Sequence, residues 1–287
     1  NGEMKKEEMQ KEEAVSSAPV PPNTEIAPIS RTEAEALAFM VENLKIELGA
    51  EAVGVSDDNL YKFILWKKDV IRAATRFRAH VEWRHRNPSF FDEIPLQVSH
   101  DAIMFRIAQS GMLVAPEEMV TKTGSPVLVG QLDKNDMSSD ARTANDIARM
   151  VFYAFDRMIE REAAQRHGIT ILLDMSAVSG KNFDSAIPKL LATCGGCFPI
   201  RINAIYCLST PWWLKNVCKA HFSPELRARV QFIKNVSEIY DVIEKEKFLT
   251  DHGGEVEFDA YSWVSTQMQR ESTGEVGSLK DCIVSPS

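Results

Sequence analysis

The sequence predicts an α/β protein, with an N-terminal helical lobe followed by a mostly parallel sheet whose strands are joined by crossover helices. Two observations support this fold class. Residues 30–115 carry apolar side chains at the three- and four-residue spacing of amphipathic helices. From residue 116 onward, short runs rich in valine and isoleucine alternate with helical patterns, as in proteins with parallel sheets. We therefore expect a helical region at 30–115 and an α/β domain at 116–269.

The helical region contains four helical patterns. In the first, Ser30 and Glu33 have capping-box spacing, and an apolar stripe then runs to Gly49. The third pattern stops at Asn87-Pro88, because a proline disfavours helical geometry in the residue before it. The expected helix starts are Ser30, Ser56 or Asp57, Asp69 and Ser99.

The α/β domain contains four strand candidates and two further helical patterns. The run ITILLDM at 169–175 is continuously apolar, which is typical of a strand that is covered on both faces. The helical patterns lie at 143–168 and at about 184–194. The expected strands are 125–133, 169–175, 201–210 and 229–235.

The two ends of the chain have little apolar bulk. Residues 1–29 mix Glu and Lys and then read SSAPVPPN, and residues 270–287 are similarly polar. Segments of this composition bury too little apolar surface to offset the entropy lost on ordering. We expect disorder at 1–29 and a loose tail at 270–287.

Composition excludes several classes of protein. The 287 residues carry a formal net charge of −8, whereas a nucleic-acid-binding protein needs a broad basic face. No apolar run approaches the roughly 18 residues that span a bilayer, and no signal peptide opens the sequence. We therefore expect a cytoplasmic protein with reduced cysteines that meets membranes only at their surface.

No motif in the sequence indicates catalysis, a metal site or a cofactor. Cys194 and Cys197 form a lone CxxC pair, which follows a helical pattern instead of opening one. The six histidines lack metal-binding spacing, and neither a GxSxG motif nor a phosphate-binding loop is present. Asp174 ends a buried strand, but no partner is near it in sequence. We expect a protein that is not an enzyme.

The stretch from Ser209 to Asn235 gathers bulky apolar and basic residues. Trp212 and Trp213 follow a proline, and residues 201–235 hold six Lys and Arg residues against Glu225 alone. Interfacial tryptophans beside a basic cluster suit an anionic bilayer surface. Alternatively, the tryptophans belong to the core and the charges form a solvated helix face.

Five segments in order resemble the CRAL-TRIO lipid-binding family. They are 58–88, which ends in WRHRNP, 124–136 (GSPVLVGQLDKND), 169–175 (ITILLDM), 198–213 (FPIRINAIYCLSTPWW) and 248–254 (FLTDHGG). The resemblance covers about residues 56–265. It implies an α/β lobe that encloses an apolar pocket for one hydrophobic lipid, with a movable helix after the third strand as its gate.

The resemblance and the basic stretch together give the expected site residues. The pocket floor is expected at Leu173, Met175, Ile205 and Cys207, and the gate residues that line the pocket at Leu214, Val217 and Cys218. The residues expected to bind the head group or dock on the membrane are Arg201, Arg227, Arg229, Lys234, Trp212 and Trp213.

The sequence also departs from the family pattern. Ile200 stands where the acidic partner of a phosphatidylinositol site is expected, and Leu226 replaces a threonine. The gate segment from Pro211 to Pro224 is about three residues short, and the register of Lys62, Lys67 and Lys68 is open. These departures favour an alternative function, a scaffold or regulatory module that binds a protein partner and has a reduced or empty cavity.

Overall fold

The computed structural model describes residues 30–91, 96–138, 142–221 and 223–274. The disorder predicted for residues 1–29 and most of the tail predicted for 270–287 lie outside the described residues. The side chains of residues 217–222 also lie outside them.

The N-terminal region is helical, as expected, and three of its four predicted N-caps are confirmed. Side chains of Ser30, Ser56 and Asp69 each accept a hydrogen bond from a backbone amide three residues later. The fourth start is Asp101 instead of Ser99, and its carboxylate accepts from two amides of the first turn. The helices are α2 (Arg31–Leu48), α3 (Asp57–Lys67), α4 (Val70–Arg86), α5 (Pro88–Phe91) and α6 (Ala102–Gln109), with a short turn η1 (Gly49–Ala52) after α2.

Five strands form one sheet in the order β1-β2-β3-β4-β5, which confirms the predicted fold class. The first pair is antiparallel and the other three pairs are parallel. The two-residue first strand was not expected, and it places the start of the sheet inside the predicted helical region. The strands are β1 (Leu113–Val114), β2 (Val127–Gln131), β3 (Ile169–Asp174), β4 (Ile202–Leu208) and β5 (Val230–Ile233).

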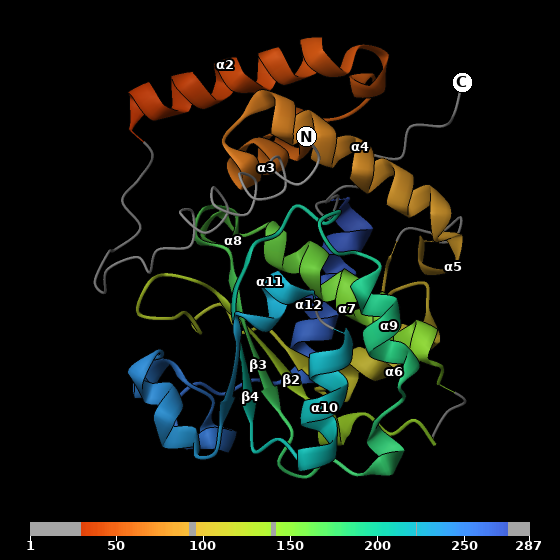
Figure 1. Ribbon diagram of the computed structural model, residues 1–287, viewed down its shortest axis with the longest axis vertical. Helices are drawn as coiled ribbons and strands as arrows, with labels where there is room; N and C mark the ends of the chain where they lie inside the picture. Colours follow the sequence, from red (N-terminus) through yellow and green to blue (C-terminus); the bar gives the residue numbers. More distant parts are fainter. Residues whose placement is uncertain (1–29, 92–95, 139–141, 222, 275–287) are drawn as a thin grey trace, which may run out of the picture.

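Helices join the parallel strands and cover one face of the sheet (Figure 1). The helix predicted at 143–168 is two helices, because the backbone of Arg161 is extended. The helices of this part are α7 (Ala144–Ile159), α8 (Glu162–His167), α9 (Ala186–Ala192), α10 (Trp212–His221), α11 (Pro224–Arg227) and α12 (Ala260–Thr273). Short turns complete it: η2 (Leu132–Lys134), η3 (Gly180–Asn182), η4 (Val236–Asp241), η5 (Lys245–Lys247) and η6 (Thr250–His252).

The two faces of the sheet belong to different apolar clusters, because alternate residues of a strand point to opposite sides. Ile171 and Ile205 lie in the larger cluster, which also contains the buried side chains of the N-terminal helices. Leu172 and Tyr206 lie in the smaller cluster with Ile239 of η4 and the apolar residues next to η5, such as Phe248. One core therefore joins the helical region to the helix-covered face of the sheet.

Helix α4 holds the loop between α9 and β4 through three polar contacts. Arg76 Nη1 donates to the carbonyl oxygen of Gly196 at 3.0 Å, and Trp83 Nε1 donates to Thr193 Oγ1 at 3.1 Å. Burial, with the nearby charge of Arg84, lowers the pKa of His80 well below its usual value, so the imidazole is neutral. Its Nδ1 lies 3.1 Å from the carbonyl oxygen of Cys197, the geometry of an Nδ1–H donor. The segment that contains Cys194 and Cys197 thus attaches the helical region to the α/β domain.

Helix α12 continues four residues beyond the predicted boundary at residue 269, which corrects the expectation of a loose tail from residue 270. The physical reason is Glu271, whose buried carboxylate accepts hydrogen bonds from the amides of Val98 and Ser99 at 3.1 and 3.0 Å. Tyr153 Oη donates to the same carboxylate at 2.7 Å. Glu271 thus ties the chain end to α7 and to the segment before α6.

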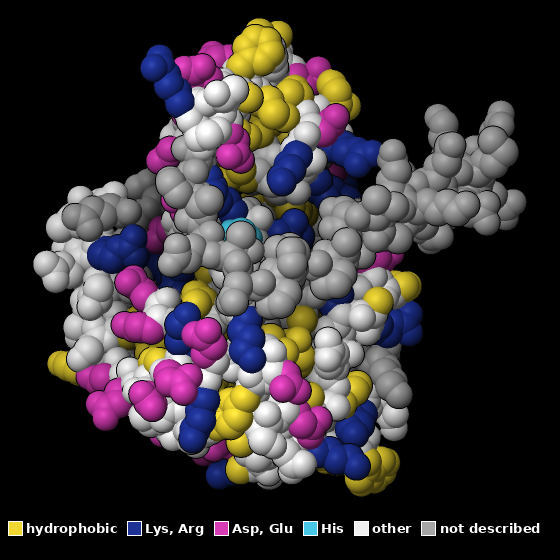
Figure 2. Space-filling view, turned by 90° about the vertical axis from the view of Figure 1, so that its left-hand side faces the viewer, with side chains coloured by type: hydrophobic (Ala, Val, Ile, Leu, Met, Phe, Trp, Pro, Cys, Tyr) yellow, Lys and Arg dark blue, Asp and Glu magenta, His cyan; other side chains and the backbone are white. Residues whose placement is uncertain are grey.

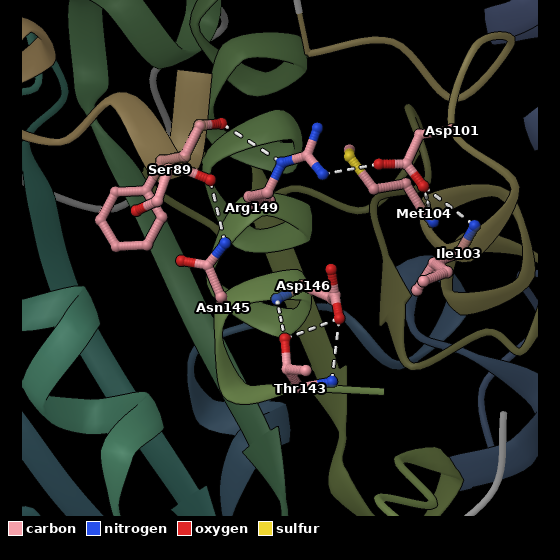
Figure 3. A network of polar contacts seen from close by, with 9 residues as sticks. Ser89, Asp101, Ile103, Met104, Thr143, Asn145, Asp146 and Arg149 are labelled. Atoms are coloured by element: carbon pink, nitrogen blue, oxygen red, sulfur yellow. Dashed lines mark hydrogen bonds and ion pairs between the residues drawn. The ribbon is translucent and has the colours of Figure 1, made fainter. Parts of the chain in front are cut away.

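Figure 3 shows a second set of polar contacts around the start of α7. Thr143 and Asp146 form a capping box, which satisfies the first free amides of the helix. In the same first turn, Asn145 donates to the carbonyl of Ser89, and one turn later Arg149 Nη1 pairs with Asp101 Oδ2 at 2.6 Å. The N-cap of α6 and the segment of α5 are thereby fixed to α7.

Strand β3 directly follows a glycine that no other residue can replace without strain. Gly168 has φ of 72°, and its amide closes α8 while Ile169 already pairs with the carbonyl of Arg201 at 2.8 Å. A Cβ atom at this position would lie 2.5 Å from the backbone oxygen of Arg201. The turn therefore requires both the glycine conformation and the absence of a side chain.

We expect Gly168→Ala to lower the free energy of unfolding by at least about 2 kcal/mol, because both the positive φ and the contact with Arg201 oppose a Cβ. Urea unfolding checks this. Gly180→Ala is the matched control, since a Cβ there meets nothing within 4 Å, and it should stay within about 0.5 kcal/mol of the wild type. An equal loss in both variants would contradict the prediction.

Asp174 has a partner that its neighbours in sequence do not reveal. His252 Nε2 lies 2.7 Å from Asp174 Oδ2, and both side chains are largely buried. Burial raises the pKa of Asp174, but hydrogen bonds from His252 and Ser176 lower it by more, to about 2. The pair fastens η6 to the end of β3.

Because the pKa of Asp174 is lower in the folded protein than its ordinary value of 3.8, its stabilisation is present above about pH 4 and is lost as the pH falls toward 2. We expect Asp174→Asn to cost about 2 kcal/mol at pH 7, with the difference from wild type shrinking below pH 4. Urea unfolding at several pH values measures this. The exposed Asp251 gives the control Asp251→Asn, and a pH-independent difference for Asp174→Asn would refute the assignment.

Candidate functional site

The residues expected to form the pocket floor lie together on the helix-covered face of the sheet. Met175, Ile205 and Cys207 are buried in the larger apolar cluster, and Leu173 packs against it. Leu214 of α10 belongs to the same cluster and is 1% exposed. The sequence predicted these floor residues but not the face of the sheet on which they lie. The register of the strands places all of them on the face that the helices cover.

Helix α10 lies beside α9 on this face (Figure 1). Three of its described side chains contact the rest of the protein. Trp213 packs edge-on against Phe183 with ring centroids 5.7 Å apart, and Leu214 is buried. Lys215 Nζ lies 5.3 Å from the ring centroid of Phe232 on β5. These contacts place the first half of α10 over β4 and β5. Val217 and Cys218 are in the second half, and their side chains lie outside the described ones.

On the face that α10 covers, Cys207 and Leu214 are 0% and 1% exposed. A cavity of about 90 Å³ lies elsewhere among the described residues, at the end of β2. Val114, Gln131 and Leu249 line it, and two of these belong to the smaller cluster on the other face of the sheet. Ligand pockets have roughly 300–1,000 Å³, so this cavity does not hold a lipid.

The tryptophans and arginines of the 209–235 stretch do not form one patch, which corrects the expectation from their closeness in sequence. Arg201 and Arg229 precede β4 and β5, whereas Trp212 and Lys234 follow these strands. The two parallel strands point the same way, and the seven residues of β4 span about 20 Å. The exposed Arg227 lies on the arginine side. Trp212 is 78% exposed at the opposite edge.

Basic side chains meet where β4 and β5 begin. We call Lys68, Arg166, His167, Arg201 and Arg229 the basic cluster. Arg201 Nη2 donates to the carbonyl of Arg166 at 3.0 Å, and Arg229 Nη1 donates to the carbonyl of Ile202 at 2.6 Å. Figure 2 shows Lys and Arg side chains around a histidine at the waist between the helical region and the sheet.

The electrostatics of the basic cluster come from like charges. Burial, and then the charge of Arg229, lowers the pKa of Arg201, which nevertheless stays protonated. Burial, and then the charges of Arg201, Arg166 and Lys68, lowers the pKa of His167 and keeps its ring neutral near pH 7. Arg201 Nε and His167 Nε2 are buried without a hydrogen-bond partner in the described part of the chain. Such a site is suited to an anion.

Sequence reasoning identified Arg201 and Arg229 but missed the other members of the cluster. Arg166 and His167 come from α8, and Lys68 follows α3, so these residues are far from the 209–235 stretch in sequence. Arg166 and His167 come just before the buried strand β3, and Arg201 comes just before β4. Because parallel strands begin at the same edge of a sheet, this position in the sequence could have indicated that these residues lie near Arg201.

The remaining chemical candidates do not form a reactive site in the described residues. Burial raises the pKa of Cys194 to about 12 and also raises the pKa of Cys197, which makes both thiols poor nucleophiles near pH 7. No group of three or more His, Cys, Asp or Glu side chains that could hold a metal ion occurs among the described residues. Within the same residues, no helix has the length and apolarity needed to cross a membrane.

Comparison with known proteins agrees with this architecture. The crystal structure of Sfh5 superposes with a TM-score of 0.53, covering 88% of this chain and 100% of that chain at 10% sequence identity, which is a likeness of fold. A search of curated proteins finds no significant match. The sequence model of the CRAL/TRIO domain matches residues 110–254, half of the chain. The chain therefore belongs to the CRAL/TRIO domain family of lipid-binding proteins.

Proposed function

We propose that the chain is a non-enzymatic carrier that binds one hydrophobic lipid, a phospholipid or an isoprenoid-like molecule, between α10 and the sheet. It exchanges or presents that lipid at membranes. The observation that supports this most is the position of α10, a short helix that covers the apolar floor residues Ile205 and Cys207. Displacing α10 gives a lipid chain access to this face.

In this proposal α10 moves away from the sheet to admit the lipid. Trp213, Leu214 and Lys215, in its first turn, contact the body of the protein. Burying a lipid chain in the protein contributes about 0.8 kcal/mol for each methylene. A bilayer solvates the same chain equally well, so burial of the chain does not favour one lipid over another. Polar contacts with the head group must therefore determine which lipid is bound.

The two ends of the sheet have separate tasks in this proposal. Trp212 is exposed at the edge where α10 begins, and the exposed Lys234 follows β5 at the same edge. Tryptophan rings settle at head-group depth and lysines are attracted by anionic lipids, so this edge contacts the bilayer transiently. Arg201 and Arg229 at the opposite edge hold the head group.

We expect Trp212→Ala to slow lipid transfer between vesicles that contain anionic phospholipid severalfold, because the interfacial anchor is lost. The free energy of unfolding should change by less than about 0.5 kcal/mol, since the ring is 78% exposed. A fluorescence assay of transfer from donor to acceptor vesicles measures the rate.

Phe39→Ala is the matched control, because Phe39 is 68% exposed on α2 at the other end of the molecule (Figure 1). Equal transfer rates in wild type and Trp212→Ala would count against membrane contact at this edge. A slowing in both variants would show that exposed aromatic rings act without regard to position.

The close packing under α10 favours a second candidate function. Cys207 and Leu214 are 0% and 1% exposed, as expected for a scaffold module that binds a protein partner and carries no lipid. Native mass spectrometry of the freshly purified chain separates the two functions. A mass increment that matches one lipid supports the carrier, and a chain that stays empty after incubation with vesicles supports the scaffold.

A further inference from the structure

Helix α2 has apolar side chains on two faces. The inner face packs into the larger apolar cluster through Leu37, Val41, Leu44 and Leu48. The opposite face carries a second stripe, because side chains that are three or four positions apart share one side of a helix. We call this second set the outer stripe: Ala36, Phe39, Asn43 and Ile46.

The outer stripe is exposed to solvent, whereas the outer face of an ordinary amphipathic helix is polar. Phe39 and Ile46 are 68% and 78% exposed, Ala36 is exposed and Asn43 is half-buried. In Figure 2, hydrophobic side chains gather at the top of the molecule, where the helical region lies. Grouped apolar side chains on a surface mark a site of interaction. The spacing of the outer stripe is that of a helix–helix seam, in which a single Asn fixes the register of the partner.

Glutamates border the outer stripe on both sides. The helical repeat places Glu35 and Glu42 along one side and Glu47 along the other. All three side chains are exposed. Residues 31–53 contain five Glu residues, and their basic residues are Arg31 and Lys45. The outer stripe therefore lies in an acidic surface.

Ion pairs within the chain neutralise this surface only in part. The three bordering glutamates pair with Arg31, Lys45 and Arg78 at 2.9, 2.8 and 3.5 Å. Lys45 also pairs with Asp57, and Arg78 with Glu51, so each of these two cations serves two carboxylates. Exposed ion pairs contribute little free energy, so the glutamates can pair with cations of a partner instead.

This charge determines what covers the outer stripe. A second copy of the chain would bring glutamates against glutamates, and an anionic bilayer would repel them. Residues 1–29 contain six Glu and three Lys, so this segment of the chain is acidic as well. A helix whose apolar side chains are bordered by Lys or Arg matches both the seam and its charge.

We propose that the outer stripe is a docking surface for an amphipathic helix of a partner protein, with lysine or arginine on both sides of its apolar seam. That seam covers Phe39 and Ile46, and the basic side chains pair with the three bordering glutamates. Helices α2 and α10 lie at opposite ends of the molecule (Figure 1), so this partner leaves the face beneath α10 accessible. The inference holds whether or not the chain carries a lipid.

The test uses the full chain and two synthetic helical peptides as long as α2, each labelled with a fluorophore. Both peptides have leucine at the seam positions, and they carry either lysine or glutamate on both sides of the seam. Fluorescence anisotropy measures the Kd of each peptide. We expect the lysine peptide to bind at least about tenfold more tightly, because it forms ion pairs where the glutamate peptide meets like charges.

The variant Phe39→Ala/Ile46→Ala tests the apolar part. Alanine favours helix, so α2 stays folded, which circular dichroism checks. Binding of the lysine peptide should weaken at least about tenfold, as when central apolar contacts of an interface are lost. Ile71→Ala is the matched control, since Ile71 is 61% exposed on α4, and it should stay within about twofold of the wild type. Equal binding by the wild type and the double variant would show that overall negative charge attracts the peptide, and would overturn the inference.

The variant Glu35→Lys/Glu42→Lys tests the electrostatic part and should reverse the preference, so that the glutamate peptide binds more tightly. Glu117→Lys/Glu118→Lys makes the same change of charge at two exposed residues outside α2 and should keep the preference for lysine. A reversal in both variants, or in neither, would contradict docking at the outer stripe.

Two further measurements address the other occupants. A dimer in analytical ultracentrifugation that Phe39→Ala/Ile46→Ala dissociates would show that a second copy covers the outer stripe, and would overturn the inference. Loss of co-sedimentation with phosphatidylserine vesicles in the same variant would assign the surface to a bilayer and would also overturn it. A monomer whose vesicle binding does not change in this variant supports the helical partner.

Discussion

The close approach of Gly168 to Arg201 is the constraint on which the basic cluster depends. The chain leaves α8 and enters β3 within one residue, so Ile169 pairs with the carbonyl of Arg201 while Arg166 and His167 remain at the helix end. A side chain at residue 168 would push β3 away from β4 and separate Arg201 from Arg166. Asn203 reinforces the junction by donating to the carbonyl of His167. Two adjacent strand starts and one helix end thus hold like charges together.

In the proposed carrier, the sheet separates the site of head-group recognition from the site of bilayer contact. Parallel strands carry the chain from the basic cluster at one edge to Trp212 at the other, and α10 returns across the helix-covered face. Head-group recognition and bilayer contact are therefore about 20 Å apart, which is close to the length of an extended acyl chain. The helical region is fixed to this frame by α4, and the end of the chain by Glu271.

The fold class could be predicted from the periodicity of apolar residues. Features that depend on neighbours in sequence could be predicted as well, whereas features that depend on distant segments could not. N-caps such as Ser30 and Asp69 act within one turn, so sequence located them to the residue. β1 and α12 escaped prediction because distant partners stabilise them: β1 pairs with β2, and Glu271 bonds to Val98 and Tyr153. The basic stretch at 201–235 was found, but its division between two edges depends on the direction of β4. The pairing of His252 with Asp174 and the effect of the Lys68 charge on His167 both link distant segments, which a single sequence does not reveal.

The central claim is that α10 leaves the sheet when the protein meets lipid. Hydrogen–deuterium exchange of the backbone amides, with and without phospholipid vesicles, tests it most directly. We expect faster exchange in Trp212–His221 on addition of vesicles, while exchange in Ala144–Ile159 of α7, which is buried in the core, stays unchanged. Unchanged exchange in α10 under conditions where the chain takes up a lipid would contradict it, because the lipid would then have entered without moving this helix.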